Sequence, residues 1–439
     1  MLRPVLVVAA LLALAAPARA ATVSLSAAGG GETGSKVNYV AGAGERNRVT
    51  IAGEPTGGVL VTDAGSPLFH GGGCANIDAS TVSCPPGSAG AVAFVSVSLA
   101  DGDDGLEASS APGHPWTLLA VSAGTGNDTV DAAGVHAPSL SDVFYGVTVE
   151  GGPGADVIIG SDGSDDLAGG AGRDELHGLG GDDLLDGDGT GETETGFDAA
   201  AADVIDGGPG TDTVTYAAHR RGVKVDLTHP SSAGSPKEGD QLSGIENVIG
   251  SAFSDNLIGG RGPNDLTGFQ AEPFATSARG GDRLSGGGGD DDLSGSRRAD
   301  RFFGGGGNDS LALVGGADTT SCGAGRDTVR PGGNPLVLSR SCERVDDGST
   351  SFGSLKVAKG RLGGGLFADS DATQCTESVH VKARRGGASY GSASWSDPAP
   401  AKLSIKLNAA GRRAAKRKAQ AVVRAQGCVG GVAAWIVRL

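Results

Sequence analysis

Residues 151–186 read GGPGADVIIGSDGSDDLAGGAGRDELHGLGGDDLLD, and one nine-residue pattern occurs in this run four times without a gap. Each copy approaches the template G-G-x-G-x-D-x-U-x, in which U is a large apolar residue. The sixth and eighth positions hold Asp156 with Ile158, Asp165 with Leu167, Asp174 with Leu176, and Asp183 with Leu185. A fixed short period predicts a repeat architecture, in which each copy is one structural unit.

The same pattern continues toward the C-terminus, with three interruptions. Breaks occur at 187–197, 216–249 and 268–276, and six unbroken copies then run from Ser277 to Arg330. The sixth positions of these further copies hold Asp203, Asp212, Asp255, Asp282, Asp291, Asp300, Asp309, Asp318 and Asp327, with Asn264 in one copy. Looser copies upstream contain Asp104 and Asp128. The repeat therefore covers about 151–330, with outliers before it.

Each nonapeptide divides into a turn and a short strand. The glycines of the first six residues adopt turn conformations and allow close backbone approach. The last three residues form a strand whose central apolar side chain alone points inward. Two units make an 18-residue coil, and stacked coils form a parallel β-solenoid, so we expect an all-β fold. Such a thin core agrees with 79 glycines and 4% aromatic residues in 439.

The stacked coils bring aspartates close together. Units two apart lie above one another at the inter-strand spacing of about 4.8 Å, where two carboxylates repel. A divalent cation reverses this repulsion, and carboxylates with turn carbonyls make an oxygen-only site that suits Ca²⁺. Zinc would need His or Cys, which the turns do not offer. The alternatives are a disordered acidic linker or a metal-free solenoid, but a linker would not keep an apolar residue two places after nearly every aspartate.

These copies resemble the repeat of the hemolysin-type calcium-binding (RTX) family. The resemblance implies a parallel β-roll in which sixth-position aspartates and turn carbonyls bind several calcium ions. Carried over by position, the ligands are Asp156, Asp165, Asp174, Asp183, Asp203, Asp212, Asp255, Asp282, Asp291, Asp300, Asp309, Asp318 and Asp327. Many members leave the cell through a one-step exporter that recognises a C-terminal signal. The N-terminus of this chain predicts a different route.

Residues 1–20 have the features of a secretory signal peptide: a positive start, a short apolar run and an Ala-Arg-Ala cleavage site. We therefore expect a secreted protein without a transmembrane segment in its mature chain. Six cysteines in an exported chain suggest disulfides. Local pairing is the simplest of 15 connectivities and favours Cys74–Cys84, Cys322–Cys342 and Cys375–Cys428.

The predicted organisation has four parts. They are a signal peptide at 1–20, a β-rich region at 21–150, a calcium-binding β-roll at 151–345 and a basic, β-sandwich-like domain at 352–439. The N-terminal region either caps the roll or binds a ligand. The basic domain presents either a solvated face or a contact for an anionic envelope polymer or surface, and NAAGRRAAKRKAQAVV predicts a short basic helix or turn after Asn408. The acidic middle, in a chain of net charge −16, argues against nucleic acid as a partner.

The sequence contains neither H-E-x-x-H nor G-x-S-x-G, and its seven histidines are scattered, so we expect each to be at the surface or structural. The repeat accounts for the paired acids. We therefore predict a non-enzymatic, calcium-stabilised extracellular protein. The alternative is a carbohydrate-modifying lyase or epimerase with calcium modules, since parallel β-helices host such enzymes. Activity on uronic-acid polymers would distinguish the two.

Overall fold

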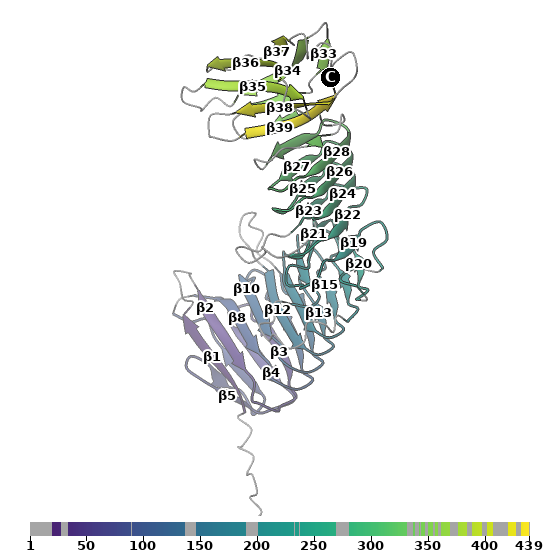
Figure 1. Cartoon of the computed structure of the whole chain (residues 1–439). Helices are drawn as coiled ribbons and strands as arrows, with labels where there is room; N and C mark the ends of the chain where they lie inside the picture. The colour runs from purple at the N-terminus through teal and green to yellow at the C-terminus, as the bar shows by residue number, and fades with distance from the viewer. Residues whose placement is uncertain are drawn as a thin grey trace, which may run out of the picture. The chain divides into compact units, whose positions relative to one another are not determined.

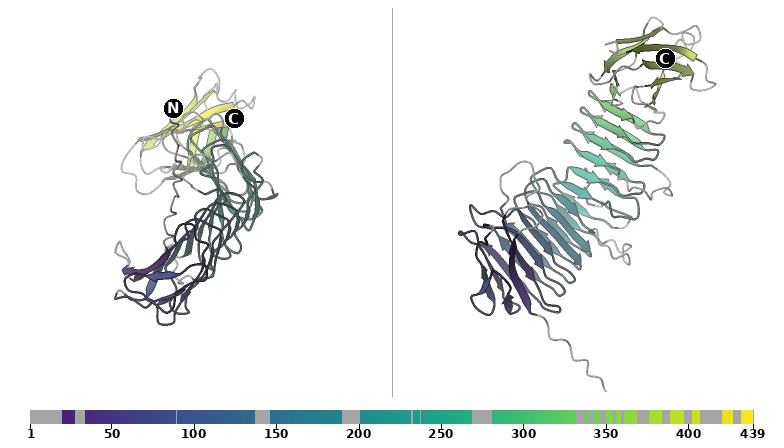
Figure 2. Two further views of the ribbon diagram at one scale, coloured as in Figure 1. Left: turned by 90° about the horizontal axis from the view of Figure 1, so that it is seen from below. Right: turned by 90° about the vertical axis from the view of Figure 1, so that its left-hand side faces the viewer.

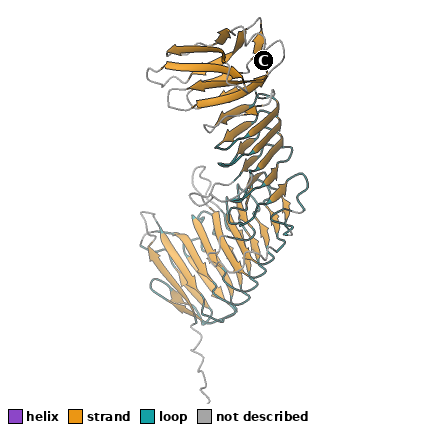
Figure 3. Ribbon diagram, viewed as in Figure 1, coloured by secondary structure: helices purple, strands orange, loops and turns teal. Residues whose placement is uncertain are grey.

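The computed structural model (Figure 1) describes residues 20–331 apart from 28–33, 89, 137–145, 190–200, 232, 237 and 269–280. Beyond 331 it describes Cys342 and the backbone of the strands between Val337 and Arg438. The regular structure of these residues is β-strand without helix (Figure 3), as predicted. No helix in this described part is long and apolar enough to cross a membrane.

The chain divides into two units, Met1–Gly154 and Ala155–Leu439, which are described separately. The strands of the first unit are β1 (Ala21–Ala27), β2 (Ser35–Val40), β3 (Arg48–Gly53), β4 (Val59–Asp63), β5 (Leu68–His70), β6 (Ala75–Asn76), β7 (Thr81–Cys84), β8 (Val92–Ser98), β9 (Gly105–Ser109), β10 (Leu118–Ser122), β11 (Thr129–Gly134) and β12 (Gly146–Pro153).

The first unit contains two groups of paired strands. In one, β2, β8, β10 and β12 pair in parallel, and β1 adds antiparallel to β2. In the other, β3, β9 and β11 pair in parallel, and β4 and β7 add antiparallel strands. Side chains alternate between buried and exposed along these strands, as period-two sequences require. The disulfide Cys74–Cys84 joins β7 to the residue before β6, as predicted.

The second unit begins with the repeats. Its strands before the C-terminal region are β13 (Val157–Ile159), β14 (Asp166–Ala171), β15 (Glu175–His177), β16 (Leu184–Asp186), β17 (Val204–Asp206), β18 (Thr213–Thr215), β19 (Lys224–Asp226), β20 (Gln241–Ser243), β21 (Asn247–Ile249), β22 (Asn256–Ile258), β23 (Asp265–Thr267), β24 (Arg283–Gly288), β25 (Asp292–Ser294), β26 (Arg301–Gly306), β27 (Ser310–Leu313), β28 (Thr319–Ala324), β29 (Thr328–Pro331), β30 (Val337–Leu338) and β31 (Arg344–Asp346).

Alternate repeats contribute strands to opposite sheets of a parallel β-roll. Arg283 in β24 pairs with Arg301 in β26, and Asp292 in β25 pairs with Ser310 in β27, so one coil is 18 residues long. Figure 2 shows these strands stacked one above another. Each coil buries the eighth-position residues of its two repeats between the sheets; Leu257 and Leu293, for example, are fully buried, and Thr320 is the one polar member among the described copies. The sequence prediction of a parallel β-roll is therefore confirmed.

Residues 216–249, predicted as a break between repeats, contain three strands of the roll. The chain first forms β19, returns to form β20 and β21, and then continues into β22, which pairs with β19. One sheet of the roll, from β14 to β31, runs past this point without interruption. The opposite sheet ends at β20 and a new one starts at β19. We call residues 216–239, which connect β18 to β20 and contain β19, the excursion.

The C-terminal strands pair antiparallel. They are β32 (Thr350–Gly353), β33 (Lys356–Ala358), β34 (Arg361–Ala368), β35 (Thr376–Ala383), β36 (Ser389–Ser396), β37 (Lys402–Lys406), β38 (Gln420–Gln426) and β39 (Val432–Arg438). β36, β35, β38 and β39 form one sheet, and β37 pairs with β34. The disulfide Cys322–Cys342 forms as predicted. The Cys375–Cys428 pair and the signal peptide apart from Ala20 fall on residues outside the described ones. Of the segment 408–423, predicted as a basic helix or turn, residues 408–419 also lie outside them, and the last four residues are strand, because they begin β38.

Candidate metal centre

The sixth-position aspartates form hydrogen-bonded columns along the roll, on either side of the excursion. The backbone N–H of one aspartate donates to Oδ1 of the aspartate one coil later; for Asp282 and Asp300 the N···O distance is 2.7 Å. These bonds, 2.7–3.1 Å long, join Asp156 to Asp174, Asp165 to Asp183, Asp174 to Asp203, Asp183 to Asp212, Asp255 to Asp282, Asp282 to Asp300, Asp291 to Asp309, Asp300 to Asp318, and Asp309 to Asp327. All the aspartates predicted as ligands lie in these columns and are buried.

Within the described part of the chain, the second carboxylate oxygen of most of these aspartates has no hydrogen-bond donor. Oδ2 is buried and unsatisfied in Asp174, Asp183, Asp203, Asp212, Asp255, Asp282, Asp291 and Asp309. Asp300 differs, because the N–H of Ser296 donates to its Oδ2 at 2.7 Å. A buried carboxylate oxygen without a donor or cation costs several kcal/mol. A repeated arrangement of such oxygens therefore requires cations or protons to balance it.

Where a repeat begins with glycine, that glycine lies against the second carboxylate oxygen in several copies. A Cβ added to Gly286 would be 2.1 Å from Oδ2 of Asp291, and one added to Gly250 would be 2.5 Å from Oδ2 of Asp255. Neither glycine has a positive φ. The absence of a side chain at these positions therefore keeps space open beside the carboxylate, where a cation can approach.

Other turn glycines bring carbonyl groups of successive coils into register. Gly305 and Gly307 have φ values of 116° and 134°, which favour glycine. A Cβ on either would come within 2.2 Å of the Gly287 carbonyl oxygen or 1.9 Å of the Gly289 carbonyl oxygen, respectively. The turns thus stack closely and place carbonyl oxygens along the same edges as the carboxylates. This oxygen-only donor set fits calcium, which takes six to eight oxygen ligands.

Burial and mutual repulsion raise the pKa values of carboxyl groups in the columns. Burial, with further repulsion from Asp165 and Asp212, raises the pKa of Asp183 from 3.8 to about 7. Burial, with repulsion from Asp240 and Asp188, raises the pKa of Asp203 to about 8. The backbone hydrogen bonds to Oδ1 oppose these shifts without cancelling them. Without a cation, the columns therefore favour proton uptake near neutral pH.

The columns also contain three residues that the sequence pattern did not identify: two carboxylate acceptors and one backbone N–H donor. The N–H of Asp203 donates to Oδ1 of Asp240 at 3.1 Å, and that of Asp212 donates to Oε2 of Glu246 at 3.0 Å. Val223, which has no carboxylate, supplies the N–H for Oδ1 of Asp255. Each lies two residues before a buried apolar residue, namely Leu242, Val248 and Val225. An acidic residue two places before an apolar one, without the glycine template, would have identified Asp240 and Glu246, but Val223 carries no such signal.

Asn264 shows how a column accommodates a neutral member. Its N–H still donates to Oδ1 of Asp291 at 3.0 Å. Its own Oδ1 accepts the Gly260 N–H at 2.7 Å, and its Nδ2 donates to the Glu246 carbonyl at 2.6 Å. The amide therefore satisfies its hydrogen bonds within the protein and leaves no oxygen in need of a cation.

The looser copies in the first unit have the same bond. The N–H of Asp104 donates to Oδ1 of Asp128 at 2.8 Å, although the two residues are 24 apart in sequence. The N–H of Asn47 donates to Oδ1 of Asp104 at 2.6 Å. Burial raises the pKa of Asp104 to about 6. The carboxylate column is therefore also a feature of the first unit, where the coils are longer.

We expect Gly250→Ala to weaken calcium-dependent stability more than Gly306→Ala. The new methyl group at 250 would clash with Oδ2 of Asp255, whereas a Cβ at 306 meets nothing within 4 Å. Neither position has a positive φ, so the backbone conformation strains alanine at neither of them. Calcium titrations followed by thermal unfolding should show a higher calcium midpoint for Gly250→Ala. Equal midpoints in the two variants would contradict the assignment of this space to a cation.

Asp291→Asn is expected to reduce the number of bound calcium ions, whereas Asp290→Asn should leave it unchanged. Both substitutions remove one negative charge, but Asp291 is buried with an unsatisfied Oδ2 and Asp290 is exposed. Equilibrium dialysis followed by metal analysis measures the stoichiometry directly. A loss of calcium in both variants would indicate that net charge, and not the column, controls binding.

Comparison with known proteins agrees with this geometry. A family model described as RTX calcium-binding nonapeptide repeat (4 copies) matches residues 148–176, 159–190, 188–218, 242–270, 278–297, 285–320 and 294–329. A comparison with curated proteins found no match. The matched segments coincide with the carboxylate columns of the second unit. In residues 148–218, 242–270 and 278–329, the chain is therefore similar to the RTX calcium-binding nonapeptide repeat family.

Proposed function

We propose that this calcium-binding chain is an exported protein whose repeat region folds when it binds Ca²⁺, and that its role is structural or interactive. The observation that carries this proposal is the set of buried Oδ2 atoms without hydrogen-bond donors in the columns. Each of them is satisfied by a cation or a proton, and calcium suits the oxygen-only surroundings. Calcium binding would then supply free energy for folding.

The export part of the proposal rests on one feature of the sequence and one of the structure. Residues 1–20 have the pattern of a signal peptide, and the disulfides Cys74–Cys84 and Cys322–Cys342 suit an oxidising compartment. Extracellular calcium modules typically bind with dissociation constants of about 10⁻⁴–10⁻³ M. The repeats would therefore remain calcium-free inside a cell and become loaded outside it.

The non-enzymatic part of the proposal rests on how the acidic residues are used. Paired carboxylates such as Asp291 and Asp309 accept backbone hydrogen bonds within the columns, so their spacing has a structural explanation. The basic composition of 352–439 supports contact with an anionic envelope polymer or surface. Turnover of uronic-acid polymers by the calcium-loaded protein would contradict this part of the proposal.

Limited proteolysis of the full mature chain tests calcium-dependent folding. Arg283 and Arg301 have exposed side chains, but their backbones lie in β24 and β26. We expect trypsin to cleave after both arginines in chelator and to spare them in 10 mM calcium, as read by mass spectrometry. An unfolded reference protein digested in parallel controls for the protease. Equal cleavage with and without calcium would refute the proposal, and the N-terminal sequence of the extracellular chain tests export separately.

A further inference from the structure

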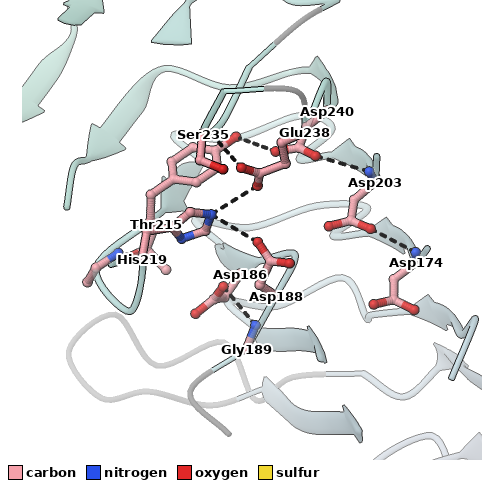
Figure 4. A network of polar contacts seen from close by, with 12 residues as sticks. Asp174, Asp186, Asp188, Gly189, Asp203, Thr215, His219, Ser235, Glu238 and Asp240 are labelled. Carbon is pink, nitrogen blue, oxygen red and sulfur yellow. Dashed lines mark hydrogen bonds and ion pairs between the residues drawn. The ribbon is translucent and has the colours of Figure 1, made fainter. Parts of the chain in front are cut away.

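A histidine and two carboxylates meet where the excursion rejoins the roll. Asp188 follows β16, whereas His219 and Glu238 lie near the two ends of the excursion (Figure 4). We call Asp188, His219 and Glu238 the histidine cluster. All three side chains are largely inaccessible, with 17%, 9% and 0% of their surface exposed, respectively. This cluster lies outside the repeat template and differs from the columns because it contains a nitrogen donor.

Both carboxylates approach the same atom of the imidazole ring. Nε2 of His219 is 3.0 Å from Oδ2 of Asp188 and 2.9 Å from Oε1 of Glu238. A single N–H cannot point at both oxygens with good geometry. Ligands bound to one metal ion at about 2.1 Å, at angles between 90° and 109°, lie about 3.0–3.4 Å apart. The convergence of three donor atoms therefore fits the coordination sphere of a small metal ion.

A further buried oxygen faces the same turn. Asp203 is fully buried, and its Oδ2 has no hydrogen-bond donor. A Cβ added to Gly187 would lie 2.3 Å from this oxygen, so Oδ2 is directed at the residue before Asp188. The unsatisfied Oδ2 of Asp203 therefore lies beside the turn that contains Asp188, and this oxygen also requires a cation or a proton.

The donors of the cluster are held in place by their neighbours. The N–H of Ser235 donates to Oε2 of Glu238, which leaves Oε1 directed at the imidazole. The ring of His219 packs edge-on against Tyr216 with centroids 5.1 Å apart, and the Tyr216 hydroxyl donates to Oδ2 of Asp240 at 3.0 Å. Fixed orientation of this kind is a property of built metal sites.

We propose that Asp188, His219 and Glu238 bind one divalent first-row transition-metal ion of the zinc class. Imidazole nitrogen is a good ligand for zinc, whereas calcium takes oxygen ligands. The site therefore selects a different ion from the columns and joins both ends of the excursion to the turn after β16. This transition-metal site is separate from the calcium-dependent function proposed above, and the proposal does not require the protein to be exported.

The test uses the full mature chain, dialysed against zinc in 10 mM calcium and then against zinc-free calcium buffer. We expect about one retained zinc per chain in the wild type and none in His219→Gln. His177→Gln is the matched control, because Nε2 of His177 contacts only Glu175, at 3.0 Å, and its other nitrogen is 3.9 Å from Asp206. His177→Gln should retain its zinc, and both variants should bind calcium as the wild type does.

Cobalt substitution of the wild type gives a second measurement that needs no variant. Visible absorption bands of bound Co²⁺, lost on adding zinc, would support one shared transition-metal site. Absence of retained zinc and of these bands would overturn the proposal and leave imidazolium as the internal cation that balances Asp188 and Glu238. Equal zinc in wild type and His219→Gln would also overturn it, by placing the zinc elsewhere.

Discussion

Removal of calcium from the mature protein is expected to abolish most of the β-sheet signal of residues 155–330. At 10 mM calcium, a site with a dissociation constant of about 10⁻⁴–10⁻³ M stabilises the fold by about 1.4–2.7 kcal/mol. About five such sites would contribute roughly 7–14 kcal/mol, which is comparable to the whole stability of a typical domain. The core cannot compensate, because one apolar side chain per nonapeptide is buried.

Circular dichroism during a calcium titration measures this loss, and hydrogen exchange with mass spectrometry assigns it to the repeats. Magnesium at equal concentration is the control, since Mg²⁺ demands stricter octahedral geometry. The spectrum should recover when calcium is returned. Identical spectra and thermal midpoints in chelator and in 10 mM calcium would show that the columns are satisfied without metal.

Acidification is expected to stabilise the calcium-free roll and to destabilise the calcium-loaded one. Burial, with repulsion from Asp309 and Asp290, raises the pKa of Asp291 to about 7 from an ordinary value of 3.8. Burial, with repulsion from Asp300, likewise raises the pKa of Asp318 to about 7. Between pH 4 and about 7 the calcium-free folded state therefore binds more protons than the unfolded state, so its stability falls as pH rises.

The calcium-loaded state behaves in the opposite way, because a bound cation favours the ionised carboxylates and protons compete with it. Its stability should fall as pH is lowered from 8 to 5. Thermal midpoints across this range, measured in chelator and in 10 mM calcium, should therefore shift in opposite directions. If the calcium-free protein has no measurable transition at pH 8, a cooperative one should emerge as the pH falls. Parallel shifts in the two conditions would contradict the role of the buried carboxylates.

The period of the sequence was sufficient to predict the β-roll and the thirteen repeat aspartates that lie in its columns. An apolar residue two places after an aspartate determines which side chain faces the core and therefore where the carboxylate lies. Asp240 and Glu246 do not fit the repeat template, because the template also demands glycines. Those glycines are needed where successive turns stack closely. Asp240 and Glu246 follow the excursion, where the turns do not follow the nine-residue template.

The histidine cluster could not have been predicted from spacing. Asp188 and His219 are 31 residues apart, and they meet only because the excursion leaves the stack and returns. Likewise, the pattern marked Asn264 as a departure, but only the structure shows that its amide donates to the Glu246 carbonyl. Contacts made by irregular segments depend on the path of the chain, which a periodic pattern does not specify.

The 18-residue register has a consequence for how such a gene can change. Arg283, Arg301 and Thr319 occupy equivalent places in three successive coils, and so do their neighbours. Deleting or duplicating 18 residues here would rejoin equivalent backbone partners and preserve the hydrogen bonds on either side. The number of repeats can therefore change by whole coils through recombination. Such a change would alter the length of the roll while keeping the pattern of backbone hydrogen bonds between its coils.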